Sequence, residues 1–326
     1  MMDDKMPGLL LQYGLLRPEV TLIRHNENRT YKVNDPSQGN DYLLRVHDPV
    51  TVNLAGIQHT RQGIEAELRL LEAIASGAEL TAQMPVVNLR GQLASELEWE
   101  GRTFYCSLLR WIEGRNLTTE DLSSDAAAYC LGAQVAQLHA FFATYNKALP
   151  TDRPDYGISG TEKMLAQIRR GVELELFAEE HFTTIQRTFA LFVERLTSWR
   201  PDCLAQGMIH ADLNKSNILV TPSGAYVFID YCLFGYGYLL LDVAMAAMMV
   251  PKEHRIQVVN GYYGMELTLE EIDPVVDGFM LSAVLGYYAF MMEHQAVHPR
   301  IREKLPAFCE TRCVPFLNGE RIFLSF

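Results

Sequence analysis

The stretch Met208–Asp230, MIHADLNKSNILVTPSGAYVFID, organises the chain. It reads as a short apolar run, a polar loop, a β-branched run, a turn at Pro222–Gly224, and a third apolar run that ends in a carboxylate. The loop contains His210, Asp212 and Asn217 in the spacing H-x-D-x-x-x-x-N. We therefore expect a strand before the loop, a strand directly after it, and a hairpin that brings Asp230 back alongside.

This spacing is the catalytic-loop pattern of kinases. Phosphoryl transfer needs an acceptor oxygen positioned in line and cations over the phosphates, so one base, one amide and one carboxylate can form the centre of a site. We predict that Asp212 orients or deprotonates a substrate hydroxyl, that Asn217 is a magnesium ligand, and that His210 supports the loop backbone. The structural alternative is an Asx-turn, because Asp and Asn readily hydrogen-bond their own backbone.

Asp230 follows the apolar run Ala225–Ile229. A carboxylate at the end of a buried strand is unfavourable unless it is paired or binds a metal. Together with Asn217 it would supply the hard oxygen ligands that magnesium prefers. The alternative is an Asp that caps a helix or stabilises a turn.

The composition describes a globular protein of two lobes or domains: 326 residues, 48% hydrophobic and 21% charged. A net charge of −12 argues against nucleic acid and anionic membranes as partners. Residues 111–326 carry 26 acidic and 17 Lys/Arg residues, whereas residues 1–110 carry 14 and 11. The acidic excess of the second part would suit a cationic substrate; a solvated acidic surface is the alternative.

Targeting and cysteine patterns indicate a cytoplasmic protein. The six cysteines show no C-x-x-C pair, which predicts reduced thiols. The N-terminus lacks the features of a signal peptide, and the apolar run Tyr238–Val250 is too short to span a bilayer and contains Asp242. The sequence does not specify an oligomeric state.

The first part of the chain predicts strands around one helix. Expected strands, from alternation and turn residues, are Glu19–Arg24, Arg29–Val33, Asp41–His47, Gln92–Trp99 and Thr103–Ile112. A short helix is expected at Met6–Tyr13, and a longer one at Gly63–Ser76 with Gly77 as its C-cap. The first three strands should form an antiparallel meander.

From Leu117 onward, helical periodicity dominates, with the opening stretch as the only strand signal after Ile112. Expected helices run from Ser123 or Ser124 to about Tyr145 and over Glu162–Arg170, Glu175–Trp199, Leu239–Val250, Glu253–Tyr263, Leu269–Glu293 and Pro299–Leu317. The junction should lie at Leu109–Gly114, so we divide the chain into an N-lobe, residues 1–110, and a C-lobe, residues 111–326.

The motifs MIHADLNKSNIL, VFIDY and YLLLDVA resemble the aminoglycoside phosphotransferase and choline kinase-like family of small-molecule kinases. The resemblance implies an α+β, bilobal, protein-kinase-like fold with a small antiparallel-sheet N-lobe and a mainly helical C-lobe. It also implies that Asp242 braces the catalytic loop; an Asp stabilised at a helix N-terminus is the alternative. The family has I-D-[FW] where protein kinases have D-F-G, and Tyr231-Cys232 fits neither pattern, but the expected metal role needs only the carboxylate of Asp230.

The resemblance extends to the nucleotide site. The loop His25–Arg29, with Asn28, resembles the family's nucleotide-positioning loop, although an ordinary hairpin turn is the alternative. Arg45 in DYLLRVH stands where the family usually has a phosphate-binding Lys. Glu67 is the expected partner of Arg45, and Glu65, about 200° round the same helix, is the second choice.

CSLLRWIEGRNL resembles the family's hinge, so the backbones of Arg110, Trp111 and Ile112 are expected to contact adenine. Trp111 in simple core packing is the alternative. VAQLHAF resembles a structural motif of the large lobe, in which His139 is a satisfied buried histidine rather than a catalyst.

These features predict an enzyme that uses ATP and Mg²⁺ to transfer the γ-phosphate to a hydroxyl of a small molecule, such as an amino sugar or amino alcohol. The alternative is a non-catalytic, kinase-like binding or structural protein, favoured by Arg45 and the glycine-poor loop. A protein kinase is disfavoured because the chain has no D-F-G, no A-P-E and only a short interval between Asp230 and the next helix.

Overall fold

The structure is a computed structural model that describes residues 2–25, 28–37, 39–49, 56–77, 79–145, 153–198, 205–272 and 274–326. Contacts divide the chain into two compact units. The first unit comprises Met1–Arg115, Ala148–Arg153 and Leu219–Cys232, and the second comprises Asn116–Lys147, Pro154–Ile218 and Leu233–Phe326. The two-range lobe division expected from the sequence stays a prediction.

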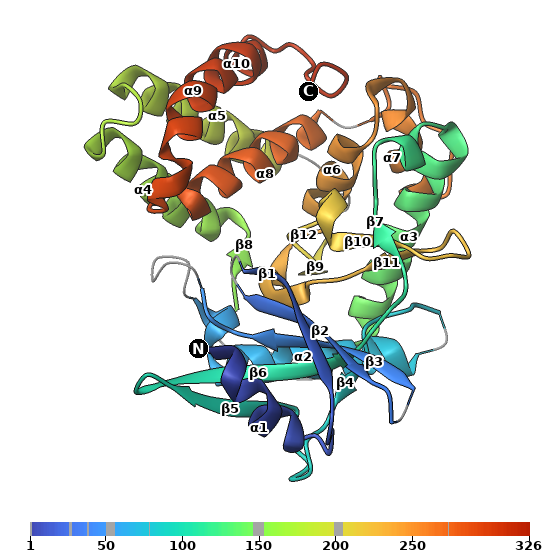
Figure 1. Cartoon of the computed structure of the whole chain (residues 1–326). Coiled ribbons are helices and arrows are strands. Elements are labelled where there is room, and N and C mark those ends of the chain that lie inside the picture. Colours follow the sequence, from blue (N-terminus) through green and yellow to red (C-terminus); the bar gives the residue numbers. More distant parts are fainter. Residues whose placement is uncertain are drawn as a thin grey trace. The chain divides into compact units, whose positions relative to one another are not determined.

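The first unit is built on one antiparallel sheet in the order β1-β2-β3-β6-β4, with β5 paired to β6 (Figure 1). Its strands are β1 (Glu19–His25), β2 (Arg29–Asp35), β3 (Asn40–Val46), β4 (Pro85–Val86), β5 (Ala94–Trp99) and β6 (Arg102–Arg110). The predicted meander of the first three strands is confirmed, and so is the hairpin of β5 and β6.

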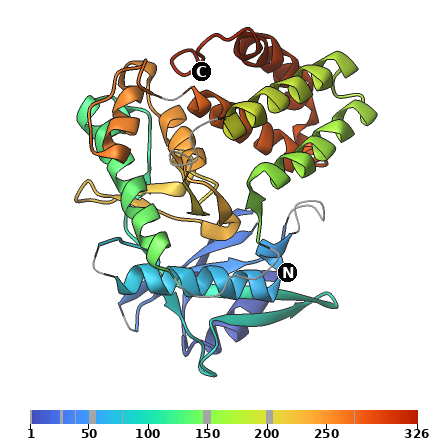
Figure 2. The same ribbon diagram turned by 180° about the vertical axis from the view of Figure 1, so that it is seen from behind.

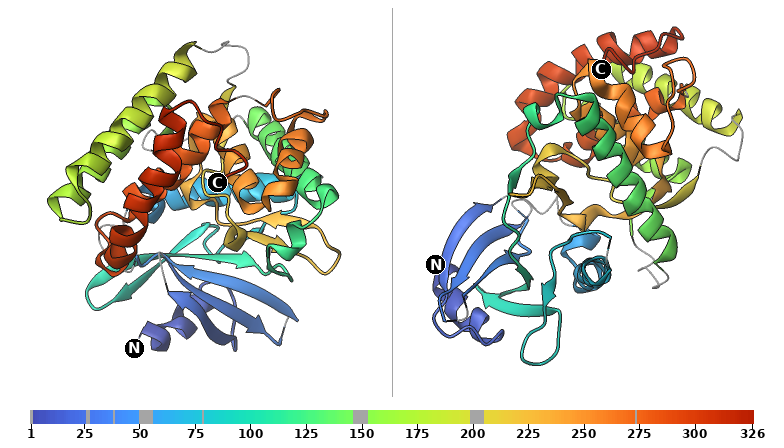
Figure 3. Two further views of the ribbon diagram at one scale, coloured as in Figure 1. Left: turned by 90° about the horizontal axis from the view of Figure 1, so that it is seen from above. Right: turned by 90° about the vertical axis from the view of Figure 1, so that its right-hand side faces the viewer.

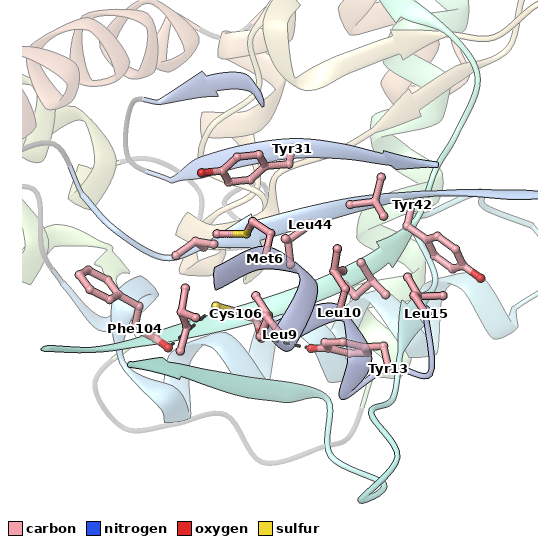
Figure 4. Packing of buried hydrophobic residues seen from close by; sticks show 14 residues of the cluster. Met6, Leu9, Leu10, Tyr13, Leu15, Tyr31, Tyr42, Leu44, Phe104 and Cys106 are labelled. Carbon is pink, nitrogen blue, oxygen red and sulfur yellow. Dashed lines mark hydrogen bonds between the residues drawn. The ribbon is translucent and has the colours of Figure 1, made fainter. Parts of the chain in front are cut away.

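The two faces of this sheet carry different helices because strand side chains alternate. Helix α1 (Met6–Leu11) packs its buried Met6, Leu9 and Leu10 on the face that carries Leu44 and Cys106 (Figure 4). Helix α2 (Arg61–Ser76) lies along the sheet in the view from behind (Figure 2), and its Glu67 contacts Arg45 of β3. Arg45 therefore projects from the face opposite to its neighbour Leu44.

Two further strands complete the first unit. The predicted hairpin forms between β10 (Ile218–Val220) and β11 (Tyr226–Phe228), and the turn between them is closed by the bond from the Thr221 backbone N–H to the Ala225 carbonyl, 2.9 Å. Strand β7 (Arg115–Asn116) pairs with β10, so the boundary between the units passes through both strands. Asp230 follows β11 before the short turn Tyr231–Leu233.

The second unit is mainly helical (Figure 3). Its helices are α3 (Asp125–Thr144), α4 (Ile158–Glu173), α5 (Glu179–Ser198), α6 (Leu240–Met249), α7 (Arg255–Tyr263), α8 (Val275–Met291), α9 (His298–Phe308) and α10 (Val314–Leu317). A π turn at Cys309–Cys313 joins α9 to α10. Across both units, short 3-10 turns occur at Met2–Lys5, Ile57–His59, Glu120–Leu122, Lys215–Asn217, Tyr231–Leu233, Lys252–His254 and Gln295–Val297.

Two expectations for this part were wrong. Short strands β7, β8 (Asp155–Tyr156) and β12 (Gly235–Tyr238) occur outside the opening stretch, and β12 joins β8 to β9 (Gln206–Ile209). Helix α8 begins at Val275 rather than Leu269, because Thr268–Glu271 forms a side-chain-bonded turn and Pro274 is the N-cap of the helix. The last expected helical run, Pro299–Leu317, is confirmed, with a π turn between α9 and α10.

Helices α3 and α7 approach closely at two glycines. A Cβ on Gly132 would overlap the Val258 carbonyl, and a Cβ on Gly261 would overlap the Tyr129 carbonyl. The two helices can therefore pack at this distance only with glycine at both positions.

In the described part of the chain, no helix combines the length and the apolar character needed to cross a membrane. The expected cytoplasmic location stays a prediction. Cys203 and Trp199 lie outside the described residues, and the five described cysteines are free thiols.

Candidate functional site

The predicted catalytic loop follows β9, which is fixed in the second unit by its antiparallel pairing with β12. The loop ends in the 3-10 turn Lys215–Asn217, which Asn214 begins by accepting the Ser216 backbone N–H at 2.9 Å. Asx-type capping, the structural alternative for this loop, is therefore present at Asn214. The capping leaves the Asp212 carboxylate to make other contacts.

Two amides hold the carboxylate of Asp212. Asn214 Nδ2 donates to Asp212 Oδ1 at 3.0 Å, and Asn217 Nδ2 donates to Asp212 Oδ2 at 2.7 Å. Asn217 Nδ2 also lies 2.9 Å from the Asp212 carbonyl oxygen. Both of these contacts of Asn217 use its amide nitrogen, Nδ2. Its amide oxygen, Oδ1, takes part in neither of them and is the kind of hard oxygen atom that can bind a metal ion.

Asp242 supports the loop backbone from the first turn of α6. Its Oδ2 accepts the backbone N–H of His210 at 2.8 Å, and its Oδ1 accepts the backbone N–H of Ala211 at 2.8 Å. Ala211 has φ +65°, the left-handed region that a residue with a Cβ rarely adopts. His210 is fully buried, and its Nδ1 accepts the Asp212 backbone N–H at 3.3 Å. These contacts are the ones that the predicted bracing roles of His210 and Asp242 require.

A longer chain of hydrogen bonds connects Asp242 to α3 and α7. His139 Nε2 lies 3.0 Å from Asp242 Oδ2, and His139 Nδ1 lies 2.9 Å from the Tyr262 hydroxyl. Burial acts to raise the pKa of Asp242, but the hydrogen bond and charge of His139, together with His210, outweigh burial and hold that pKa below its ordinary value. His139 is a satisfied buried histidine, as the sequence indicated.

In the first unit, Asp230 lies beside two arginines. Arg24 Nη2 is 3.5 Å from Asp230 Oδ2, and Arg45 Nη1 is 3.7 Å from Asp230 Oδ1. Like Ala211, Asp230 adopts the left-handed backbone conformation although it is not glycine, with φ +63°. Such backbone strain clusters at functional sites, where the surrounding structure holds it.

Arg45 makes one close ion pair and keeps unused donors. Its Nη1 lies 2.9 Å from Glu67 Oε1, and both side chains are buried. Burial, the largest influence, acts to lower the pKa of Arg45, but attraction to Glu67 and then to Asp230 raises that pKa overall. Among the described residues, Arg45 Nε and Nη2 have no hydrogen-bond partner, nor do Glu67 Oε2 and Asp230 Oδ1.

The expected nucleotide-positioning loop is only partly visible, because Asn26 and Glu27 lie outside the described residues. The ends of the loop are anchored at Asp48: Arg29 Nε lies 2.8 Å from its Oδ2, and His25 Nε2 lies 3.1 Å from its carbonyl oxygen. Asn28 is half-buried. The structure thus fixes the base of the loop, and the nucleotide contact of Asn28 stays a prediction.

The three expected hinge residues differ in what their backbones can still bind. The Arg110 N–H donates to the Met84 carbonyl at 2.8 Å, and the Trp111 N–H donates to the Asp41 carbonyl at 3.1 Å. The Trp111 ring lies under Lys32, whose Nζ is 4.6 Å from the ring centroid. The structure shows no such backbone bond for the Ile112 N–H within the described chain. The adenine contacts of Arg110, Trp111 and Ile112 stay a prediction.

The donor set fits a nucleotide with magnesium rather than a closed metal site. No group of three His, Cys, Asp or Glu side chains in the described residues is placed to hold a metal ion. Magnesium bound with a nucleotide uses one or two carboxylates and the phosphates. Asp230 of the first unit and Asn217 of the second unit each carry an oxygen of the kind that magnesium prefers, and their role as its ligands stays a prediction. Phosphate oxygens, in turn, match the unused guanidinium donors of Arg45.

Sequence reasoning missed three residues of this arrangement: Arg24, Asp48 and Ala211. In the sequence, Arg24 is one polar residue in a predicted strand. No pattern in its neighbouring residues indicates a contact with Asp230, which lies more than 200 positions later in the chain. Asp48 follows β3 without any pattern of its own. Ala211 carried no signal of its own, because alanine does not favour the left-handed conformation that it adopts here.

Solved structures show the fold. The microcompartment-associated aminopropanol kinase superposes with a TM-score of 0.76 at 20% identity, covering 99% of both chains. The amicoumacin kinase hAmiN, solved with AMP-PNP and Ca²⁺, gives 0.69 at 17% identity over 97% of both chains. The predicted α+β, protein-kinase-like fold class is confirmed.

Sequence relatives agree with this. A protein of Klebsiella aerogenes named "Probable ketoamine kinase" is 25% identical over 171 residues, 47% of this chain and 52% of that protein. The chain thus matches about half the length of this curated relative. The family model described as "Phosphotransferase enzyme family" matches residues 19–274. The chain belongs to the phosphotransferase enzyme family.

Proposed function

We propose that this protein is an ATP- and Mg²⁺-dependent kinase that phosphorylates a hydroxyl of a small molecule. The observation that carries the proposal is the buried Arg45, whose Nε and Nη2 have no partner among the described residues although Glu67 holds its Nη1. Each buried unsatisfied donor costs about 1–3 kcal/mol, and phosphate oxygens would satisfy both. Family membership agrees with this ligand.

The proposed roles follow from the chemistry. The Asp212 carboxylate accepts the proton of the substrate hydroxyl while that oxygen forms the new bond to the γ-phosphorus and the bond to the β-phosphate oxygen breaks. Asp230 and Asn217 are the proposed magnesium ligands. Magnesium, when bound, neutralises charge on the phosphates. Arg45, steadied by Glu67, contacts the α- and β-phosphates.

The proposed acceptor carries an amine as well as a hydroxyl. Relatives are named for ketoamines and aminopropanol, and the acidic excess of residues 111–326 favours a cationic substrate. A sugar-amine adduct and a short amino alcohol are therefore the first two acceptors to compare.

An ADP-release assay with Mg-ATP tests the proposal across ketoamines, aminopropanol, ethanolamine, choline and aminoglycosides. We expect turnover with at least one, and its loss in Asp212→Asn, because an amide cannot accept the hydroxyl proton. Asp125→Asn is the matched control, since Asp125 is exposed and the ion pair that the described residues show for it is with His254. Turnover that survives Asp212→Asn would refute the role of Asp212.

The non-catalytic alternative makes a different prediction. A binding protein would gain thermal stability with Mg-ATP or an acceptor, because a ligand of the folded state stabilises it, and yet release no ADP. A folded protein that Mg-ATP does not stabilise at all would contradict both the kinase and the nucleotide-binding interpretation.

A further inference from the structure

Arg24 is a charged residue of the first unit that neither the catalytic-loop motif nor the hinge explains. It lies on β1, the edge strand of the sheet, and its side chain is 41% exposed. The pairing of β1 with β2 shifts register between Leu22 and Arg24. Such a bulge turns a side chain away from the regular alternation, and bulges are frequent next to active sites. The bulge therefore sets the direction of Arg24.

The base of the hairpin is fixed directly beyond Arg24. His25 and Arg29 pair across the strands, and both contact Asp48 after β3. The position of Arg24 therefore depends on the sheet and on this anchor, not on a free loop.

Four charges meet at the end of the sheet: two arginines and two carboxylates. Glu67 and Arg45 are buried and 2.9 Å apart. Asp230 lies 3.7 Å from Arg45 and 3.5 Å from Arg24. Arg45 keeps its buried partner whatever happens to Asp230, whereas Asp230 is the only ion-pair partner that the structure shows for Arg24 within the described residues. Arg24 is thus the cation whose surroundings change when Asp230 takes another ligand.

We propose that Arg24 is a second phosphate-binding cation, which Asp230 holds in place until magnesium arrives. When Asp230 binds the metal, its charge is no longer available to Arg24. The guanidinium then lies beside the incoming phosphates, where a bidentate, charge-assisted contact is favourable. The inference rests on the proposed function, because it needs a phosphorylated nucleotide at this site.

Binding of Mg²⁺ with the non-hydrolysable nucleotide AMP-PNP, and of adenosine, tests the contact without any turnover. We expect Arg24→Gln to weaken AMP-PNP binding in Mg²⁺ by about tenfold, equivalent to about 1.4 kcal/mol, and to leave adenosine binding unchanged. Arg24→Lys should retain part of the affinity. Arg17→Gln, an exposed arginine of the same unit, is the matched control. Equal affinity for Mg-AMP-PNP in wild type, Arg24→Gln and Arg24→Lys would overturn the inference.

A double-mutant cycle tests the holding role. Asp230→Asn should tighten metal-free ATP binding in the wild-type background, both because Arg24 is released and because a negative charge is removed. Only the second effect remains in the Arg24→Gln background, so the gain should be smaller there. An equal gain in both backgrounds would show that Asp230 does not hold Arg24.

The two failures are distinguishable. If adenosine and Mg-AMP-PNP both bind wild type and Arg24→Gln equally, the inference about Arg24 is wrong and the proposed nucleotide site stands. If neither ligand binds the folded wild type, with or without Mg²⁺, the proposed function is wrong and the inference is overturned with it.

Discussion

The carboxylate of Asp242 accepts the backbone N–H of Ala211 at 2.8 Å, at a residue whose φ is +65°. One buried side chain thus fixes the strained backbone immediately before Asp212. The second oxygen of the same carboxylate holds the His210 N–H and His139. The placement of the proposed catalytic carboxylate therefore depends on a group that does not itself react.

Asp242→Asn should reduce both stability and turnover. The amide nitrogen would face a backbone N–H or His139, so at least one charge-assisted bond is lost and a buried donor is left unmatched. We expect a loss of about 2–4 kcal/mol in the free energy of unfolding and a fall in kcat of about 100-fold. Denaturant unfolding and steady-state kinetics measure these, with Asp125→Asn as control. A variant that lost stability but kept its kcat would show that Asp242 has only a structural role.

Two buried aspartates should respond to pH in opposite directions. The pKa of Asp242 is lowered, so its stabilisation is present above the ordinary carboxyl pKa and is lost as pH falls through the folded value. Burial raises the pKa of Asp277 despite its bond to Arg321, so the folded state binds its proton more tightly and stability from this group falls as pH rises.

Unfolding free energies of wild type, Asp242→Asn and Asp277→Asn, measured from about pH 7 down to about pH 2, check this. The advantage of wild type over Asp242→Asn should stay constant down to about pH 4 and shrink below it, whereas its advantage over Asp277→Asn should already grow as pH falls toward about pH 4. Parallel pH dependence in the two comparisons would contradict the opposite shifts.

Ala211→Gly should stabilise the fold and slow the reaction. Glycine adopts the left-handed conformation without the Cβ penalty, which is about 1 kcal/mol or more. The gain is partly offset by the entropy of glycine in the unfolded chain, so we expect a net gain of about 0.5–1 kcal/mol. The freer backbone should hold Asp212 less firmly and lower kcat. Ala225→Gly, at a residue outside the left-handed region, should instead be destabilising.

Glu67 and Glu65 form a matched pair on α2. Glu67 is buried against Arg45, whereas Glu65 is partly exposed and pairs with Arg61. Glu67→Gln should lower the unfolding free energy by about 2–3 kcal/mol and weaken ATP binding, because the buried Arg45 loses its main counter-charge. Glu65→Gln should change stability by less than about 0.5 kcal/mol. Similar effects of the two variants on ATP binding would contradict the importance of the Arg45–Glu67 pair.

The sequence predicts a strand, a helix or a site residue where the residues that reveal it lie close together in the chain. Alternation and turn residues identified β1, β2, β3, β5 and β6, whereas the two-residue strand β4 was not predicted. The family resemblance pointed to Glu67 ahead of Glu65 as the partner of Arg45, which the ion pair shows. The loop from His210 to Asn217 was visible because its residues are close in the chain.

Other features depend on distant partners. Strands β7, β8 and β12 contain two to four residues each, too few for a periodic pattern, and they form because another strand lies beside them. The Arg24–Asp230 and His139–Tyr262 contacts join residues separated by more than 100 positions. A single sequence carries no local trace of such a contact.

The close approach of α3 and α7 gives the last prediction. Gly132 and Gly261 allow the approach. His139 of α3 and Tyr262 of α7 lie 2.9 Å apart, from Nδ1 to the hydroxyl, and His139 in turn contacts Asp242. Gly132→Ala would push the α7 backbone away, so we expect a loss of about 1–3 kcal/mol in unfolding free energy and a reduced kcat.

Gly8 is the matched control, because it lies exposed in α1 and a Cβ there meets no atom within 4 Å. Gly8→Ala should raise stability by about 0.5–1 kcal/mol, since alanine favours the helix, and should leave kcat unchanged. Thermal unfolding and kinetics of both variants measure the contrast. If Gly132→Ala kept wild-type stability, the helices could separate without cost. The support of the catalytic loop through His139 would then not depend on their spacing.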